Sequence, residues 1–141
     1  MRIEFETVIG DDSQIKVLYD LLSKRNHKIS HVQMPSYDRH SDFVTNHPYL
    51  GWYLVKVGES YIGSFYVTDQ NSIGINILDD WIEKSFSLVL DQIKSTLLPL
   101  PAIKSVRGEF FSINVAPSNA KSIDALERSG CVLAQLTYII K

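Results

Sequence analysis

The sequence has little of several features that would reveal a special class of protein. Among its 141 residues it has one cysteine, Cys131, and its longest apolar runs are only a few residues long. One cysteine excludes an internal disulfide and any cysteine-rich metal site, and short apolar runs predict no membrane-spanning segment. Fourteen basic and sixteen acidic side chains leave a net charge of −2, which argues against binding nucleic acid or an anionic membrane through bulk charge.

The beginning of the sequence also lacks the apolar core of a signal peptide, because Glu4 and Glu6 interrupt it. A length of 141 residues suits one domain, and hydrophobic residues make up 45% of it. We therefore expect a single globular domain over residues 1–141 in the cytoplasm, with neither nucleic acid nor a membrane as its partner.

Hydrophobic periodicity predicts strands and helices in the order β-α-α-β-β-β-α-β-α-β. The predicted strands cover residues 2–8, 52–57, 61–69, 72–78, 110–115 and 131–140, and the predicted helices cover 11–25, 36–47, 80–97 and 118–129. Three antiparallel strands followed by βαβαβ predict a mixed, mostly antiparallel sheet of six to seven strands flanked by helices. The fold class is α/β, or α+β in some schemes.

The closing part of the sequence carries a pattern that combines with this element order. Asn119 opens the last predicted helix, Ser122 follows three positions later, and Arg128 and Gly130 stand at its end. Together they resemble the GNAT superfamily of acyl-CoA-dependent N-acyltransferases. The sequence departs from that family's pattern at Leu126, where an aromatic residue, often Tyr, is expected, and at Cys131, which replaces Phe.

The resemblance implies where acetyl-CoA, the co-substrate, would bind. In GNAT proteins the pantetheine arm pairs with the fourth strand, and the pyrophosphate lies at the start of the following helix, where free N–H groups and the helix dipole attract anions. The family's phosphate loop aligns with residues 82–87. The implied cofactor-binding residues are Ile75, Asn76, Ile77, Lys84, Ser85, Phe86, Ser87, Asn119 and Ser122.

That loop departs from the family pattern, because no glycine lies between Gly74 and Gly108. Asp79, Asp80 and Glu83 against Lys84 give the region a charge of −2. Each carboxylate would cost a bound dianion on the order of 1 kcal/mol after solvent screening. Alternatively, the acids complement the helix dipole themselves and there is no anion site.

Acid–base groups for acyl transfer are few. His31 and Tyr66 are the main catalytic candidates, with Tyr138 a further one, while Ser72 stands where GNAT proteins often have a glutamate. Each has an ordinary structural alternative, a polar loop residue for His31 and a packing residue for Tyr66. The candidate substrate-binding residues are Tyr37, Trp52, Ser72 and Asn114. The four histidines lack the acidic or thiolate partners of a tetrahedral site, so we expect no metal.

The region from His31 to Tyr53 is similar to that of bacterial GNAT proteins associated with surface-sugar biosynthesis. The first hypothesis is therefore an acetyl-CoA-dependent N-acetyltransferase, whose small primary amine, for example an amino sugar, attacks the thioester directly. The second is a GNAT-like binding or interaction module that has lost acyl transfer. A third is a homodimeric scaffold, joined through an exposed strand edge or through the apolar end Tyr138-Ile139-Ile140.

Overall fold

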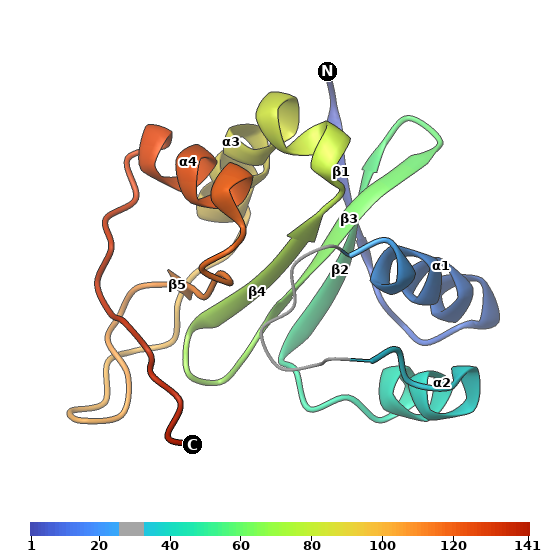
Figure 1. The fold of residues 1–141 in the computed structure, drawn as a ribbon, viewed down its shortest axis with the longest axis horizontal. Helices are drawn as coiled ribbons and strands as arrows, with labels where there is room; N and C mark the ends of the chain where they lie inside the picture. The colour runs from blue at the N-terminus through green and yellow to red at the C-terminus, as the bar shows by residue number, and fades with distance from the viewer. Residues whose placement is uncertain (26–32) are drawn as a thin grey trace.

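The computed structural model describes residues 1–25 and 33–141, which form a twisted sheet with helices on both faces (Figure 1). The elements are β1 (Ile3–Thr7), α1 (Asp12–Ser23), α2 (Tyr37–Thr45), β2 (Gly51–Val57), β3 (Ser60–Val67), β4 (Ser72–Ile77), α3 (Asp79–Thr96), β5 (Ser112–Ile113) and α4 (Ala120–Arg128). Within these residues the sheet has the order β1-β2-β3-β4-β5; its first three pairs are antiparallel and β4–β5 is parallel. The predicted mixed α/β fold is confirmed, with five strands rather than six or seven.

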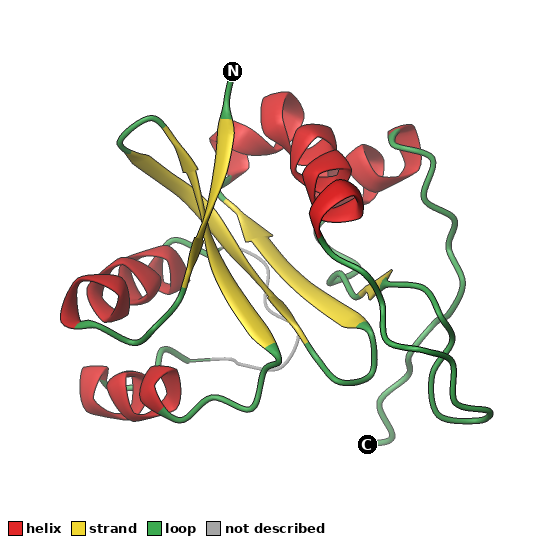
Figure 2. Cartoon of the chain, turned by 180° about the vertical axis from the view of Figure 1, so that it is seen from behind, coloured by secondary structure: helices red, strands yellow, loops and turns green. Residues whose placement is uncertain are grey.

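Helices cover both faces of the sheet (Figure 2), and a hydrophobic cluster lies under them on each face. Phe65 on β3 and Phe86 on α3 are almost completely buried in the cluster that α3 and α4 cover. Leu18 on α1, Val44 on α2 and Leu54 on β2 are buried in the other. No helix in the two described ranges is long and apolar enough to cross a membrane.

Three of the four described helices, α1, α2 and α4, begin with a side-chain cap, whereas α3 has none. The Asp11 carboxylate accepts a hydrogen bond from the Gln14 N–H, 2.8 Å, and Ser36 and Asn119 cap α2 and α4 through their side-chain oxygens in the same way. These contacts span only three residues, so local sequence is enough to predict them.

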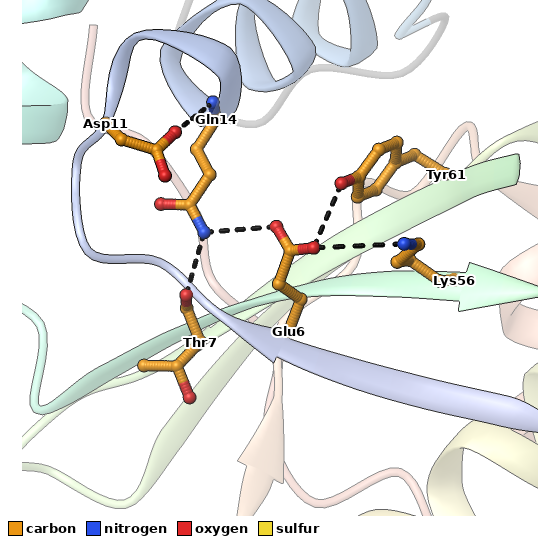
Figure 3. Close-up of polar contacts among 6 residues, drawn as sticks. All are labelled: Glu6, Thr7, Asp11, Gln14, Lys56 and Tyr61. Atoms are coloured by element: carbon orange, nitrogen blue, oxygen red, sulfur yellow. Dashed lines mark hydrogen bonds and ion pairs between the residues drawn. The ribbon is translucent and has the colours of Figure 1, made fainter. Parts of the chain in front are cut away.

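The Gln14 side chain fixes the connection between β1 and α1 (Figure 3). Its Oε1 accepts hydrogen bonds from the backbone N–H groups of Ile9 and Gly10, at 2.7 and 3.1 Å. Its Nε2 donates to the Thr7 carbonyl and to the Glu6 carboxylate, at 2.8 and 3.0 Å. Gln14 is only 5% exposed, so water cannot easily replace it in any of these hydrogen bonds.

We expect Gln14→Ala to lower the free energy of unfolding by about 2–3 kcal/mol, because it leaves several partly buried polar groups without a partner. The Glu6 carboxylate would keep its contacts with the Tyr61 hydroxyl, 2.9 Å, and the Lys56 ammonium, 3.9 Å. Urea denaturation measures the effect, and Gln70→Ala, at an exposed glutamine, is the control with a change below about 0.5 kcal/mol. Equal stability of the two variants would contradict this role of Gln14.

The last two predicted strands differ from the structure. The predicted strand 110–115 shortens to Ser112–Ile113, and the prediction of a strand over 131–140 is wrong, because residues 131–141 have no regular structure and are exposed. The alternation of apolar and polar residues indicates only which face of a segment is apolar. A strand also needs a neighbouring strand whose backbone groups form hydrogen bonds with its own.

Asn71, in the turn before β4, anchors the long connection between α3 and β5. Its Nδ2 donates to the carbonyls of Leu100 and Gly108, at 2.9 and 2.8 Å, and its Oδ1 accepts from the Leu100 N–H, 2.8 Å. Its backbone carbonyl accepts from the Ser112 N–H, 3.0 Å. Asn71 thereby sets where β5 meets β4.

Candidate functional site

The edge of β4 that faces β5 is only partly paired. The two strands pair at Ser72–Ser112 and Ile73–Ile113, and β5 ends there. From Gly74 onward, no described strand lies against this edge of β4. The chain therefore presents backbone polar groups beside a gap in the sheet, as an extended ligand requires.

A cleft occupies the place where β4 and β5 separate. One wall is formed by residues 75–79, and the other by residues 114–116 with Asn119 and Ser122. Lys24 and Arg25, at the end of α1, complete its lining. The cleft has a volume of about 20 Å³, enough for about one water, so a pantetheine arm would have to widen it.

The start of α3 closes one end of this cleft. No side chain caps it, since its N-cap residue is Leu78, and the first turn carries Asp79 and Asp80. The first-turn N–H groups of a helix have no intrahelical acceptor and attract anions. The carboxylates of Asp79 and Asp80 act against that attraction.

The predicted phosphate-loop alignment is wrong for Ser85 and Phe86. Both are buried inside α3, and the Ser85 hydroxyl donates to the carbonyl of Trp81. Residues 84–87 come after the first turn of α3. Their backbone N–H groups already donate to carbonyls within the helix, so they are not free to bind a phosphate. Lys84 and Ser87 are exposed, with the Lys84 ammonium 4.5 Å from the centre of the Trp81 ring.

Lys24 and Arg25 are cleft residues that sequence reasoning missed. From the sequence, their evident role is to interact favourably with the dipole at the C-terminal end of α1. About fifty positions separate them from β4, so nothing in the sequence links them to the cleft. The Lys24 ammonium lies 2.9 Å from the Asp20 carboxylate, one turn earlier on α1. Lys24 and Arg25 thus bring two positive charges to the cleft lining, of which the Lys24 charge is paired with Asp20.

Tyr66 lies over the centre of β4. Its ring covers Gly74, where a Cβ would overlap the ring atoms, so only glycine allows this position. The ring stacks on Tyr49, with 3.9 Å between centroids and 5° between planes. Burial, followed by the charge and hydrogen bond of Tyr66, raises the pKa of Tyr49 to about 12. Tyr49 therefore stays protonated at neutral pH.

The predicted substrate residues fall into two groups. Ser72 and Asn114 lie together where β4 and β5 begin to separate, and the Asn114 amide donates to the Ser72 hydroxyl, 3.2 Å. Trp52 is only 9% exposed, packs edge-on against Phe43 and does not line the cleft. Tyr37 packs against Tyr19 on α1 and does not line the cleft.

The remaining candidates stand apart from the cleft or outside the described residues. His31 lies outside them. His40 is buried and its Nε2 lies 2.9 Å from the Ile15 carbonyl, and burial lowers its pKa, so it is a structural residue. Tyr138 is exposed in the C-terminal segment. Residues 1–25 and 33–141 contain no group of three or more metal-ligating side chains.

Comparisons with known proteins define the fold. No protein-family profile matches the sequence, and no curated protein matches it significantly. Solved structures do match it over 92–100% of its length, and they show that the chain has the fold of the GNAT acetyltransferases.

Three of these structures are enzymes of known class. The aminoglycoside N-acetyltransferase AAC(6')-Iy, solved with a CoA bisubstrate analogue, has a TM-score of 0.62 at 7% identity, covering 100% of this chain and 98% of that one. A ribosomal-protein-alanine N-acetyltransferase from Brucella melitensis has a TM-score of 0.60 at 10% identity, covering 99% of each chain. The spermidine/spermine N-acetyltransferase SpeG from Vibrio cholerae has a TM-score of 0.56 at 13% identity, covering 92% of this chain and 79% of that one.

Proposed function

We propose that this protein is an acetyl-CoA-dependent N-acetyltransferase that acts on a small primary amine, for example an amino sugar. The observation that carries the proposal is the cleft between the unpaired edge of β4 and the end of β5, with the start of α3 at its end. Enzymes of the same fold, solved with CoA or a CoA analogue, support it. A single domain over residues 1–141 and a cytoplasmic location belong to the same proposal.

The cofactor would lie along β4. The amide groups of pantetheine would pair with the free edge at Ile75, Asn76 and Ile77, as an added strand does. The pyrophosphate would lie near the first turn of α3, where Lys24 and Arg25 would attract it. That attraction would counteract the repulsion between the pyrophosphate and the carboxylates of the first turn. Asn119 and Ser122 would contact the cofactor from the opposite wall.

Acyl transfer would proceed by direct attack of the neutral amine on the thioester carbonyl. A new C–N bond forms, the attacking nitrogen loses one proton to solvent water, the C–S bond breaks, and the CoA thiolate leaves with the pair of electrons. Backbone N–H groups of β4 would polarise the carbonyl, and Tyr66, over Gly74, would protonate the thiolate. Ser72 and Asn114 would bind the acceptor where β4 and β5 begin to separate.

The second candidate is a binding module that has lost acyl transfer. The specific observation in its favour is the start of α3, where no glycine allows close backbone approach and two carboxylates occupy the first turn. This candidate predicts either no acetyl-CoA binding or binding without turnover with any amine.

Release of CoA thiol from acetyl-CoA, measured with amino sugars, aminoglycosides and polyamines, tests the proposal. The assay needs a Cys131→Ser background, because the exposed Cys131 thiol would react with the thiol reagent. Turnover with at least one amine class supports the enzyme. Saturable binding of acetyl-CoA without turnover across the panel supports the binding module instead.

We expect Tyr66→Phe to lower kcat about 10- to 100-fold, because the variant keeps the ring but cannot protonate the thiolate. The dissociation constant of acetyl-CoA should stay within about twofold. Tyr37→Phe, outside the cleft, is the matched control and should leave kcat unchanged. An unchanged kcat in Tyr66→Phe would show that Tyr66 is only a packing residue.

A further inference from the structure

Tyr49, in the connection between α2 and β2, is held by aromatic rings on several sides. Besides the parallel ring of Tyr66, it contacts the rings of His47, Trp52 and Phe43, at centroid distances of 5.4, 5.2 and 5.8 Å. Its backbone N–H also donates to Nδ1 of His47, 3.1 Å. These contacts leave the Tyr49 ring little freedom to move away from Tyr66.

The stack of Tyr49 on Tyr66 also brings their two hydroxyls together. The ring centroids are 3.9 Å apart, the planes are within 5° of parallel, and a hydrogen bond joins the hydroxyls. Tyr49 keeps its own proton, because burial, followed by the charge and hydrogen bond of Tyr66, raises its pKa to about 12. Its hydroxyl can therefore donate to the Tyr66 oxygen when that oxygen carries negative charge.

The Tyr66 ring is restricted by β4 as well. Tyr66 pairs with Gly74 across the two strands, and its ring covers that glycine so closely that a Cβ there would overlap ring atoms. Contacts with the β4 backbone and with the Tyr49 ring together hold the Tyr66 hydroxyl in one place. A general acid needs such a fixed position relative to the group that it protonates.

The proposed direction of the cofactor brings the reacting atoms toward this pair of tyrosines. The pyrophosphate would lie at the start of α3 and pantetheine along residues 75–77, so the thioester end would point toward Gly74. Arg25, which lines the cleft, is near enough for its charge to act against the rise in the pKa of Tyr49. The two hydroxyls therefore lie within electrostatic reach of the cleft.

We propose that Tyr49 is a positioning residue: its hydroxyl holds the Tyr66 oxygen in place and donates a hydrogen bond to it while Tyr66 protonates the CoA thiolate. This inference rests on the proposed function, with Tyr66 as the acid. In that step the Tyr66 O–H bond breaks, its electron pair stays on the Tyr66 oxygen, and an S–H bond forms on CoA. Tyr49 keeps its proton throughout, and Tyr66 regains one from water.

The contact between the hydroxyls changes in strength during this step. Hydrogen bonds to a charged oxygen are roughly twice as strong as those between neutral groups. The bond from Tyr49 therefore strengthens as the proton leaves Tyr66, so it stabilises the transition state more than the bound substrates. Such a contact raises kcat and leaves the binding of both substrates almost unchanged.

Tyr49→Phe tests this role, because it keeps the ring and removes only the hydroxyl. In the Cys131→Ser background of the thiol assay, it should lower kcat about 10-fold. The KM of the amine and the dissociation constant of acetyl-CoA should stay within about twofold. The matched control is Tyr19→Phe, which removes a hydroxyl that donates to the Pro35 carbonyl, 2.9 Å, away from the cleft, and should leave kcat unchanged.

The double variant Tyr49→Phe/Tyr66→Phe separates this role from a structural one. Once Tyr66 has no hydroxyl, Tyr49 has nothing to stabilise, so the double variant should have the kcat of Tyr66→Phe within about twofold. A structural role of Tyr49 would instead lower kcat by the same factor with and without the Tyr66 hydroxyl. That result, or turnover with an unchanged kcat in Tyr49→Phe, would overturn the proposal.

Urea denaturation of the same variants tests the contact between the hydroxyls and needs no activity. The double variant should lose less stability than the sum of the losses in the two single variants, because both single changes break the same hydrogen bond. Additive losses would overturn the contact, and with it the role of Tyr49. If the natural sequence acetylated no amine, the proposed function itself would fail, even where the stability measurements showed the contact to be present.

Discussion

Asn71→Ala is expected to lower the free energy of unfolding by about 3–5 kcal/mol, and the melting temperature by roughly 10–15 °C. Three side-chain hydrogen bonds to the α3–β5 connection would be lost, at about 1 kcal/mol each, with a further cost for any partner left buried and unpaired. Alanine would also have to adopt the left-handed backbone of Asn71, φ 58°, at a cost of about 1–2 kcal/mol.

Two variants separate these causes, and both can be followed by urea and thermal denaturation. Asn71→Gly accepts the backbone conformation but makes no side-chain hydrogen bond, so it should be destabilised by about 1 kcal/mol less than Asn71→Ala. Asn46→Ala, which removes one exposed hydrogen bond to the Asp42 carbonyl, should change stability by less than about 0.5 kcal/mol. If Asn71→Ala were as stable as Asn46→Ala, the connection would not depend on Asn71.

The double variant Lys24→Glu/Arg25→Glu is expected to bind acetyl-CoA about 100-fold more weakly, a change of about 2.7 kcal/mol. Both side chains line the cleft, and reversing them replaces two attractions for the phosphates with two repulsions. Calorimetry measures the dissociation constant. Raising the salt concentration should weaken binding to the natural sequence and have less effect on the variant.

The control for bulk charge is Lys16→Glu/Lys104→Glu, which changes the net charge by the same amount at two exposed positions outside the cleft lining. It should change the dissociation constant less than about threefold, as expected for screened charges. Equal losses in the two double variants would mean that the overall charge matters rather than these two side chains. Unchanged affinity for acetyl-CoA in both double variants would show that Lys24 and Arg25 do not contribute to binding.

The sequence predicted best what short-range interactions decide. The helices α1, α2 and α4 begin within two residues of the predicted starts, directly after the N-cap residues Asp11, Ser36 and Asn119, because each cap is a contact within three residues. The strands β2, β3 and β4 were predicted to within about two residues, because aromatic and β-branched residues there alternate between two buried faces.

What depends on partners distant in sequence could not be predicted. The strand pattern of residues 131–140 says nothing about the absence of a neighbour in the structure. The predicted phosphate loop lay within α3, too late in the helix to reach its first turn, because no glycine marks the position of a backbone contact. Trp52 and Tyr66 are both aromatic strand residues, and only the structure shows that one is buried against Phe43 while the other covers Gly74.

Calorimetric titration of the protein with acetyl-CoA, compared with dephospho-CoA, is the decisive experiment on whether the β4–β5 cleft binds acyl-CoA. We expect one site per chain with a micromolar dissociation constant for acetyl-CoA, and thermal stabilisation that grows with ligand concentration. Weaker binding of dephospho-CoA would show that the 3'-phosphate contributes as well. Absence of both heat and thermal stabilisation at millimolar acetyl-CoA would show that the cleft between β4 and β5 is not a site for acyl-CoA.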